Sequence, residues 1–204
     1  MNLMPIYSTP LWQSELSEFE ELKEDFILAT EEFRKDNPTV SKPKSNVFGY
    51  QSPATLQQNH TFAPLFEYIC QMAFKACADL DFDDVDIAIT GAWLNVNDSR
   101  QCMNHEHIHG DVFSGVFYIS APEGSGKLVI QNPAINKLWK GCGLAQQKNQ
   151  FTGEVISIDP VEGSIILFPS YISHSVETND HDEERISIGF NVIALPKGTL
   201  ENPY

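Results

Sequence analysis

The stretch "QCMNHEHIHGDVFSGVFYIS" (residues 101–120) joins a run of alternating histidines to a run of β-branched and aromatic residues. His105, His107 and His109 are followed by Asp111 at the next alternate position. Alternate side chains of an extended strand share one face, so all four could point the same way, although Gly110 allows a bend near the end of this stretch. A solvent-facing polar strand would explain a single histidine, but three at this spacing ahead of a buried strand favour a metal site.

The chain changes character at Ile87. Before it, residues 15–35 and 63–80 carry apolar side chains at helical spacing, which predicts amphipathic helices. After it, β-rich runs separated by turn sequences such as PEGSGK and DPVEGS predict strands. We therefore predict one domain of the α+β class, mainly β. Its helical support spans residues 1–85, and its strands form a sandwich or barrel over residues 86–204. The predicted strand runs are IAITGAWLNVN (87–97), VFSGVFYIS (112–120), KLVIQN (127–132), EVISID (154–159), GSIILFP (163–169) and RISIGFNVI (185–193).

Composition and charge narrow the class of protein. The chain is 42% hydrophobic and 20% charged, as in globular proteins, and its net charge of −15 disfavours binding to nucleic acid. No apolar run reaches the ~20 residues of a membrane helix, and the first residues do not read as a signal peptide. Cys70 and Cys77 lie about two helical turns apart, roughly 10 Å, which is too far for a disulfide. We expect free thiols and a soluble, intracellular, cytoplasmic protein.

A distant segment, "GSIILFPSYISHSVETNDHDEERISIGFN" (163–191), offers a further histidine and an arginine. His174 is a candidate metal ligand, and we expect it on a strand antiparallel and adjacent to the strand that begins at Arg185. An arginine at the start of an apolar strand needs an anionic partner, and its planar fork suits a carboxylate. His60 and His181 lie in polar surroundings and are expected to be solvated bystanders.

Together these segments resemble the Fe(II)/2-oxoglutarate-dependent oxygenases and, more narrowly, a group of them common in bacteria and marine phages. The similarity covers nearly the whole chain and depends on the order and spacing of several motifs. It implies a double-stranded β-helix (jelly-roll, cupin-like) core, an H-x-D or H-x-H ligand pair, a distal histidine and an arginine about ten residues later. The motifs are SNVFGYQS (45–52), AWLNVN (92–97), HIHG and FSGVFYIS (107–120), APEGSGKLVIQNP (121–133), GSIILFPSYISHSV (163–176) and RISIGFN (185–191).

The resemblance implies a role for each matching residue. His174 would be the distal iron ligand, and Arg185 would bind the far carboxylate of 2-oxoglutarate. Ser187, in the R-x-S pattern, and Tyr118 would support that carboxylate. Asn95 is a candidate for the wall of the same pocket.

The first ligand pair stays open at this point. His107 and His109 match the H-x-H pair of the narrower group, although the chain is one residue shorter between that pair and Ser114. His109 and Asp111 satisfy H-x-D and would complete the usual set of two histidines and one carboxylate. We favour His107 with His109 over that pair and over His105 with His107. Three imidazoles would also suit Zn²⁺.

The function implied by the resemblance is a dioxygenase that uses Fe(II), 2-oxoglutarate and O₂, with ascorbate as a candidate reductant. It would hydroxylate a small molecule or a protein and release succinate and CO₂. The substrate, the oligomeric state and a phage origin stay open. Two rivals are a cupin-like metal enzyme without 2-oxoglutarate and a non-catalytic binding module. Residues 133–152, a long irregular stretch, are expected to form a lid or a substrate loop.

Overall fold

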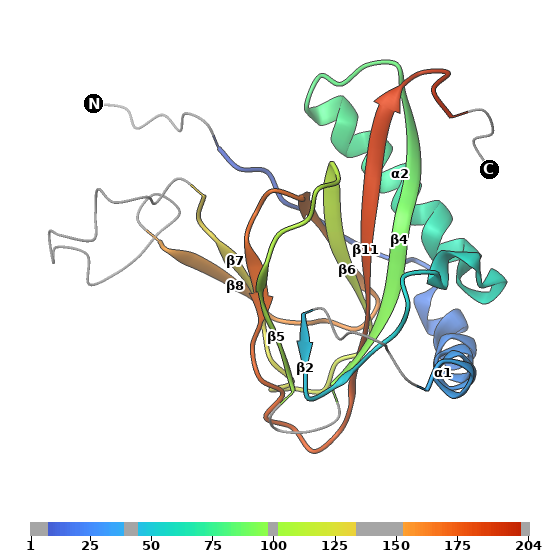
Figure 1. Ribbon diagram of the computed structural model, residues 1–204, viewed down its shortest axis with the longest axis vertical. Coiled ribbons are helices and arrows are strands. Elements are labelled where there is room, and N and C mark those ends of the chain that lie inside the picture. Colours follow the sequence, from blue (N-terminus) through green and yellow to red (C-terminus); the bar gives the residue numbers. More distant parts are fainter. Residues whose placement is uncertain (1–7, 39–44, 98–101, 134–152, 201–204) are drawn as a thin grey trace, which may run out of the picture.

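Two antiparallel β-sheets face each other in the computed structural model, and two long helices cover the outside of one sheet (Figure 1). The structure describes residues 8–38, 45–97, 102–133 and 153–200. The helices are α1 (Phe19–Asp36) and α2 (Ala63–Asp79). This arrangement confirms the predicted fold class, which is mainly β with N-terminal helices packed on one sheet.

The strands are shared between the sheets in an interleaved order. The six-stranded sheet contains, in spatial order, β1 (Trp12–Glu15), β9 (Ser164–Pro169), β6 (Phe113–Ser120), β11 (Arg185–Pro196), β4 (Val85–Asn97) and β3 (Tyr50–Gln51). The five-stranded sheet contains β2 (Asn46–Val47), β5 (Met103–His107), β10 (His174–Val176), β7 (Leu128–Gln131) and β8 (Val155–Ile158).

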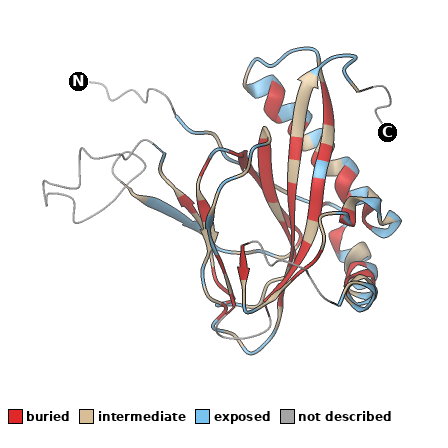
Figure 2. Cartoon of the chain, in the orientation of Figure 1, coloured by how far each residue is buried: buried red, intermediate tan, exposed pale blue. Residues whose placement is uncertain are grey.

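The two faces of the larger sheet carry different kinds of side chain. Its outer face buries Phe117, Ile188 and Phe190 in one apolar cluster with residues of the helices. There the ring of Phe26 in α1 meets that of Phe117 edge to face, with centroids 6.0 Å apart. Because side chains alternate along a strand, the intervening residues of β11 point between the sheets. Consecutive residues of β4, β6 and β11 are accordingly buried along much of each strand (Figure 2).

The N-terminal region contains short strands as well as the predicted helices. The first helix begins at Phe19 rather than at residue 15, because Trp12–Glu15 form β1 and pair with β9. Strands β2 and β3 were also not predicted. They have two residues each, too few for an alternating pattern, and they depend on pairing with β5 and β4.

The expectation that four metal-binding side chains share one strand was wrong. Strand β5 ends at His107, so His109 and Asp111 lie in the connection to β6. The backbone N–H of His109 donates to the carbonyl of Ser170, outside any ladder, at 3.1 Å.

The expectation that His174 and Arg185 lie on adjacent strands was also wrong. Strand β10 pairs with β5 and β7, whereas β11 pairs with β4 and β6. The acidic connection between them crosses from one sheet to the other. His174 and Arg185 therefore belong to opposing sheets.

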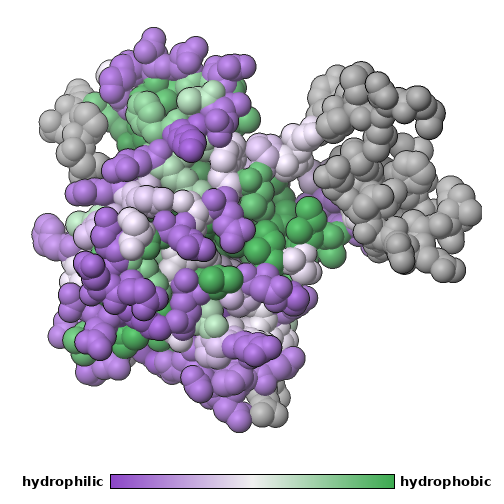
Figure 3. All heavy atoms as spheres, turned by 180° about the vertical axis from the view of Figure 1, so that it is seen from behind, coloured by the Kyte–Doolittle hydropathy of each residue, from purple (hydrophilic) through white to green (hydrophobic). Residues whose placement is uncertain are grey.

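Several other expectations concern the surface and the cysteines. No helix in the described ranges combines the length and apolar character needed to cross a membrane. Cys70, Cys77 and Cys102 are free thiols. The predicted lid, residues 133–152, lies outside the described residues except for Pro133. Seen from behind, much of the surface is hydrophilic, and hydrophobic side chains are exposed in several separate places (Figure 3).

Candidate active site

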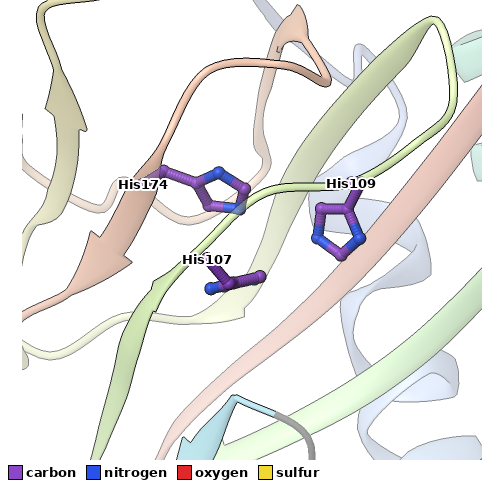
Figure 4. Close-up of side chains that lie close together, drawn as sticks. All are labelled: His107, His109 and His174. Carbon is purple, nitrogen blue, oxygen red and sulfur yellow. The ribbon is translucent and has the colours of Figure 1, made fainter.

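Three histidine side chains converge between the sheets. His107 at the end of β5, His109 in the following connection and His174 at the start of β10 each offer one ring nitrogen, and these atoms lie within 4.8 Å of one another (Figure 4). The pairing of β10 with β5 places His174 directly opposite His107, with ring centroids 4.3 Å apart. The group can hold one metal ion.

Backbone carbonyls orient two of these rings. Nδ1 of His107 lies 2.7 Å from the carbonyl oxygen of His105, and Nδ1 of His174 lies 2.9 Å from that of Ile172. A carbonyl oxygen only accepts hydrogen bonds, so the neutral form of each ring carries its proton on Nδ1. The Nε2 atoms are thereby left free to bind a metal.

Burial favours the neutral form of two of these rings, His107 and His174. His174 is 7% exposed, and its ring packs against Phe168 with centroids 4.8 Å apart. Burial lowers the pKa of His174 to about 4, and the neighbouring His107 and His109 lower it further. Burial also lowers the pKa of His107. Neutral imidazole is the form that binds metal ions.

We expect the metal-free protein to lose stability as the pH falls from about 6.5 to about 4. The pKa of His174 is about 4 in the folded chain against an ordinary value of 6.5, so in this window the unfolded chain binds a proton that the folded chain does not. The loss from this residue is on the order of 3 kcal/mol. Urea unfolding at several pH values, with His174→Gln for comparison, measures it. Equal pH slopes for the two proteins would contradict the assignment.

Asp111 and His105 lie outside this group of three. The carboxylate of Asp111 accepts a hydrogen bond from the hydroxyl of Thr90 at 2.8 Å. His105 is exposed, and its ring centroid lies 6.1 Å from that of His107. Of the alternatives raised by the sequence, only His107 with His109 is brought together with His174.

Arg185 is buried on the opposing sheet at the start of β11, with 1% of its surface exposed. Its Nη1 donates to the carbonyl oxygens of Ser125 and Gly126, at 2.5 and 3.1 Å. Gly126 has φ +92°, and a Cβ there would lie within 3 Å of Nη1 and of the backbone carbonyls of Glu177 and Thr178. No carboxylate among the described residues forms an ion pair with this guanidinium.

Three buried polar atoms, on Arg185 and on two residues beside it, have no hydrogen-bond partner among the described residues. Its own Nε, the side-chain Nδ2 of Asn97 and the hydroxyl of Ser125 are buried without a hydrogen bond to any described residue. Asn97 lies directly opposite Arg185 in the β4–β11 ladder, so their side chains share the inner face. Each of these groups can donate a hydrogen bond, and a buried donor without an acceptor is costly. An anion with several acceptor oxygens would satisfy them.

Ser187, Asn95 and Tyr118, the other pocket residues predicted from the sequence, lie next to Arg185 and Asn97 on the inner face of the larger sheet. Ser187 is in register with Asn95 on β4 and with Tyr118 on β6. Burial raises the pKa of Tyr118 to about 12, against a smaller lowering by Arg185, so the phenol stays protonated. The side-chain oxygen of Asn95 is buried and has no partner in the described ranges.

The histidines and the arginine face one interior. Tyr118 and Phe168 of the larger sheet form an apolar cluster with Leu128 and Ile130 of the smaller sheet, and Phe168 contacts His174. This apolar cluster joins the inner faces of the two sheets and contacts the histidine cluster through Phe168.

Trp93 of β4 contacts the histidine cluster through His109. Its ring lies 5.5 Å from that of His109, centroid to centroid. Gly189 on the adjacent strand leaves room for the indole, because a Cβ there would come within 2.7 Å of it. A side chain at position 189 would displace Trp93 and disturb His109.

The sequence did not indicate four residues that border these groups: Asn97, Ser125, Gly126 and Asn191. The motif PEGSGK predicted a turn, but nothing local indicated that its carbonyls meet Arg185. Asn97 could have been found from the sequence. It lies two residues after the candidate pocket residue Asn95, and alternate residues of a strand share a face.

A separate open groove of about 620 Å³ lies at the other end of β4 and β11. Asp81, Asp83 and Asp84 line it, together with the last residues of β11. Arg185 and Asn97 stand at the opposite ends of these strands, and none of the clustered histidines lines the groove. It is not part of this site.

Comparison with known proteins gives a match to one sequence family. Residues 91–191 match the family profile described as "Putative 2OG-Fe(II) oxygenase", which spans the segment from β4 to β11. A search of curated protein sequences gave no significant match.

Solved structures share the fold across nearly the whole chain. A Pseudomonas putida prolyl-4-hydroxylase matches with a TM-score of 0.62 and 13% identity, covering 90% of this chain and 93% of the other. The epimerase SnoN, solved with Fe³⁺, α-ketoglutarate and nogalamycin RO, matches with a TM-score of 0.63 and 10% identity over 96% and 89%. HygX from Streptomyces hygroscopicus, solved with nickel and 2-oxoglutarate, matches with a TM-score of 0.55 and 11% identity over 93% and 84%. The predicted double-stranded β-helix is thus confirmed.

Proposed function

We propose that this chain is a dioxygenase which oxidises an organic substrate with 2-oxoglutarate and O₂, because it belongs to the Fe(II)/2-oxoglutarate-dependent oxygenase superfamily. Fe(II) would be bound by His107, His109 and His174. Arg185 would bind the far carboxylate of 2-oxoglutarate. The observation that carries the proposal is the presence, between the same two sheets, of a cluster of three imidazoles and a buried guanidinium that forms no ion pair with a described carboxylate.

The histidine cluster fits a divalent metal ion. Its three donors come from two strands and a short connection, and two of them present Nε2 through fixed Nδ1 hydrogen bonds. Three protein ligands leave open positions for a chelating co-substrate and for O₂. When bound, Fe(II) supplies the activation of O₂ and the oxidative decarboxylation of 2-oxoglutarate to succinate and CO₂, with oxidation of the substrate.

The surroundings of Arg185 fit a carboxylate. A carboxylate offers about four acceptor positions, and the site holds the unpartnered Nε of Arg185, Nδ2 of Asn97 and hydroxyl of Ser125. The carbonyls of Ser125 and Gly126 hold the guanidinium in place before any ligand arrives. Ser187 and the protonated phenol of Tyr118 would donate further hydrogen bonds, and Asn95 would line the pocket beside them.

The residues between these groups exclude water and set the orientation of the co-substrate. Tyr118, Ile166 and Phe168 on one sheet face Leu128 and Ile130 on the other. An extended dicarboxylate held at Arg185 would have its other end directed along this apolar wall. The protein then acts by positioning and by keeping the reacting groups out of bulk solvent.

We propose a small molecule or a protein as the substrate. The net charge of −15 repels phosphate backbones, so nucleic acid is disfavoured. Among proteins with this fold, one is named as a prolyl hydroxylase solved with a peptide and another is an epimerase solved with nogalamycin RO, so the fold itself selects no substrate.

The proposal is tested by uncoupled turnover, which needs no knowledge of the substrate. Protein stripped of metal and reloaded with Fe(II) is incubated with 2-oxoglutarate, O₂ and ascorbate, and succinate is measured. We expect slow succinate formation with Fe(II) and none with Zn²⁺. Metal binding with no binding of 2-oxoglutarate in calorimetry would instead favour a cupin-like metal enzyme or a non-catalytic module.

A further inference from the structure

The third histidine of the cluster is oriented differently from the other two. His107 and His174 each point Nδ1 at a backbone carbonyl. Nδ1 of His109 instead faces a side chain, the amide of Asn191, with 3.2 Å between Nδ1 and Nδ2. His109 also lies outside the strands, so no ladder fixes its ring.

Asn191 is in turn held by two serines. Its side-chain oxygen accepts a hydrogen bond from the hydroxyl of Ser114 at 2.9 Å, and that hydroxyl lies 2.8 Å from the hydroxyl of Ser170. Both serines are buried, with 2% and 0% of their surfaces exposed. The backbone carbonyl oxygen of Ser170 also accepts a hydrogen bond from the backbone N–H of His109 at 3.1 Å. The four residues thus form one connected polar group behind the imidazole cluster.

The amide as it stands selects one tautomer of His109. Its NH₂ group donates to Nδ1, so the neutral ring carries its proton on Nε2. That proton blocks the nitrogen that would face a metal held with the Nε2 atoms of His107 and His174. Metal binding through Nε2 of His109 requires the proton on Nδ1 and an acceptor beside it.

We propose that Asn191 is a positioning residue that changes the tautomer of His109 by rotating its amide when a metal binds; this inference rests on the proposed metal site. After a half turn, the side-chain oxygen of Asn191 accepts from Nδ1–H of His109. Its NH₂ group then donates to the hydroxyl of Ser114, which donates to Ser170. A serine hydroxyl both donates and accepts, so Ser114 can pair with Asn191 in either state.

The test uses two variants of Asn191 and Co(II) as the probe metal. Asn191→Ala removes the acceptor, and we expect the dissociation constant for Co(II) to rise by about 10- to 100-fold, the usual cost of losing such a partner. Asn191→Asp supplies a permanent acceptor, and we expect it to restore binding to at least the wild-type level. Asn37→Asp, at the end of α1, is the matched control and should bind Co(II) like wild type.

A second readout is independent of metal affinity. Nitrogen-15 NMR of the imidazoles reports which ring nitrogen of His109 carries the proton. We expect Nε2–H in the metal-free wild type, and Nδ1–H in metal-free Asn191→Asp and in the Zn²⁺-loaded wild type. A merely structural role predicts that Asp is no better than Ala and that metal-free wild type and metal-free Asn191→Asp have the same tautomer, and either result overturns the proposal. If wild type binds no Co(II), the proposed function fails, while the metal-free spectra still decide the role of Asn191.

Discussion

Replacing Arg185 with methionine is expected to weaken the binding of 2-oxoglutarate by about 100-fold or more. The guanidinium is 1% exposed and makes no ion pair with the described carboxylates, so a bound carboxylate would be its main ionic partner. Truncating one member of a buried, hydrogen-bonded charge pair costs about 2–5 kcal/mol, and about 1.4 kcal/mol corresponds to a factor of ten. Calorimetric titration of the Mn(II)-loaded protein with 2-oxoglutarate measures the change.

Three controls separate this effect from misfolding. Arg34→Met removes a half-exposed arginine that pairs with Glu184 on the surface, and it should leave binding unchanged. Arg185→Lys keeps the charge without the fork and should fall between wild type and Arg185→Met. Metal affinity should be the same in all of them. If folded Arg185→Met bound 2-oxoglutarate like wild type, Arg185 would not be part of a co-substrate pocket. The protein would then be a metal enzyme of another kind.

Replacing His174 with alanine is expected to reduce metal affinity by more than about 100-fold. Loss of a residue that merely supports a ligand already costs about 10- to 100-fold, and removal of a ligand exceeds that. Titration with Co(II), followed by its visible absorption, measures the loss. Asp111→Ala, by contrast, should bind Co(II) like wild type, because its carboxylate is engaged by Thr90 and lies outside the cluster.

The comparison of these single variants also decides the ligand set. If Asp111→Ala lost affinity and His107→Ala did not, the H-x-D pair would hold the metal, which would require the connection after β5 to rearrange. His105→Ala should behave like Asp111→Ala, since His105 is exposed and outside the group of three.

Local sequence signals predicted most of the elements that surround the site. The helix expected over residues 63–80 is α2 (Ala63–Asp79), because its apolar periodicity continues over four turns. The long β-rich runs became β4, β6, β9 and β11, each within a few residues of its expected bounds. In such runs the β-branched and aromatic composition predicts a strand even when the neighbouring strand in the sheet is not known.

Features that depend on distant partners were not predictable in the same way. The end of β5 at His107 is set by where β10 stops pairing with it, which no residue between 101 and 120 encodes. The placement of His174 and Arg185 on opposing sheets depends on the interleaved order of all the strands. The contact of His109 with Asn191 joins residues 82 positions apart, and an asparagine in an apolar strand does not by itself indicate which side chain it meets.

The cluster of three imidazoles contains no carboxylate, and this determines the charge balance of any complex formed there. Imidazoles are uncharged as ligands, so a divalent ion would keep both of its positive charges inside a protein whose own net charge is −15. The incoming organic acid would bring one carboxylate to the ion and the other to a cation on the far wall. Two negative charges would then face three positive ones, so the complex would keep one net positive charge. Small inorganic anions are therefore expected to compete for the metal.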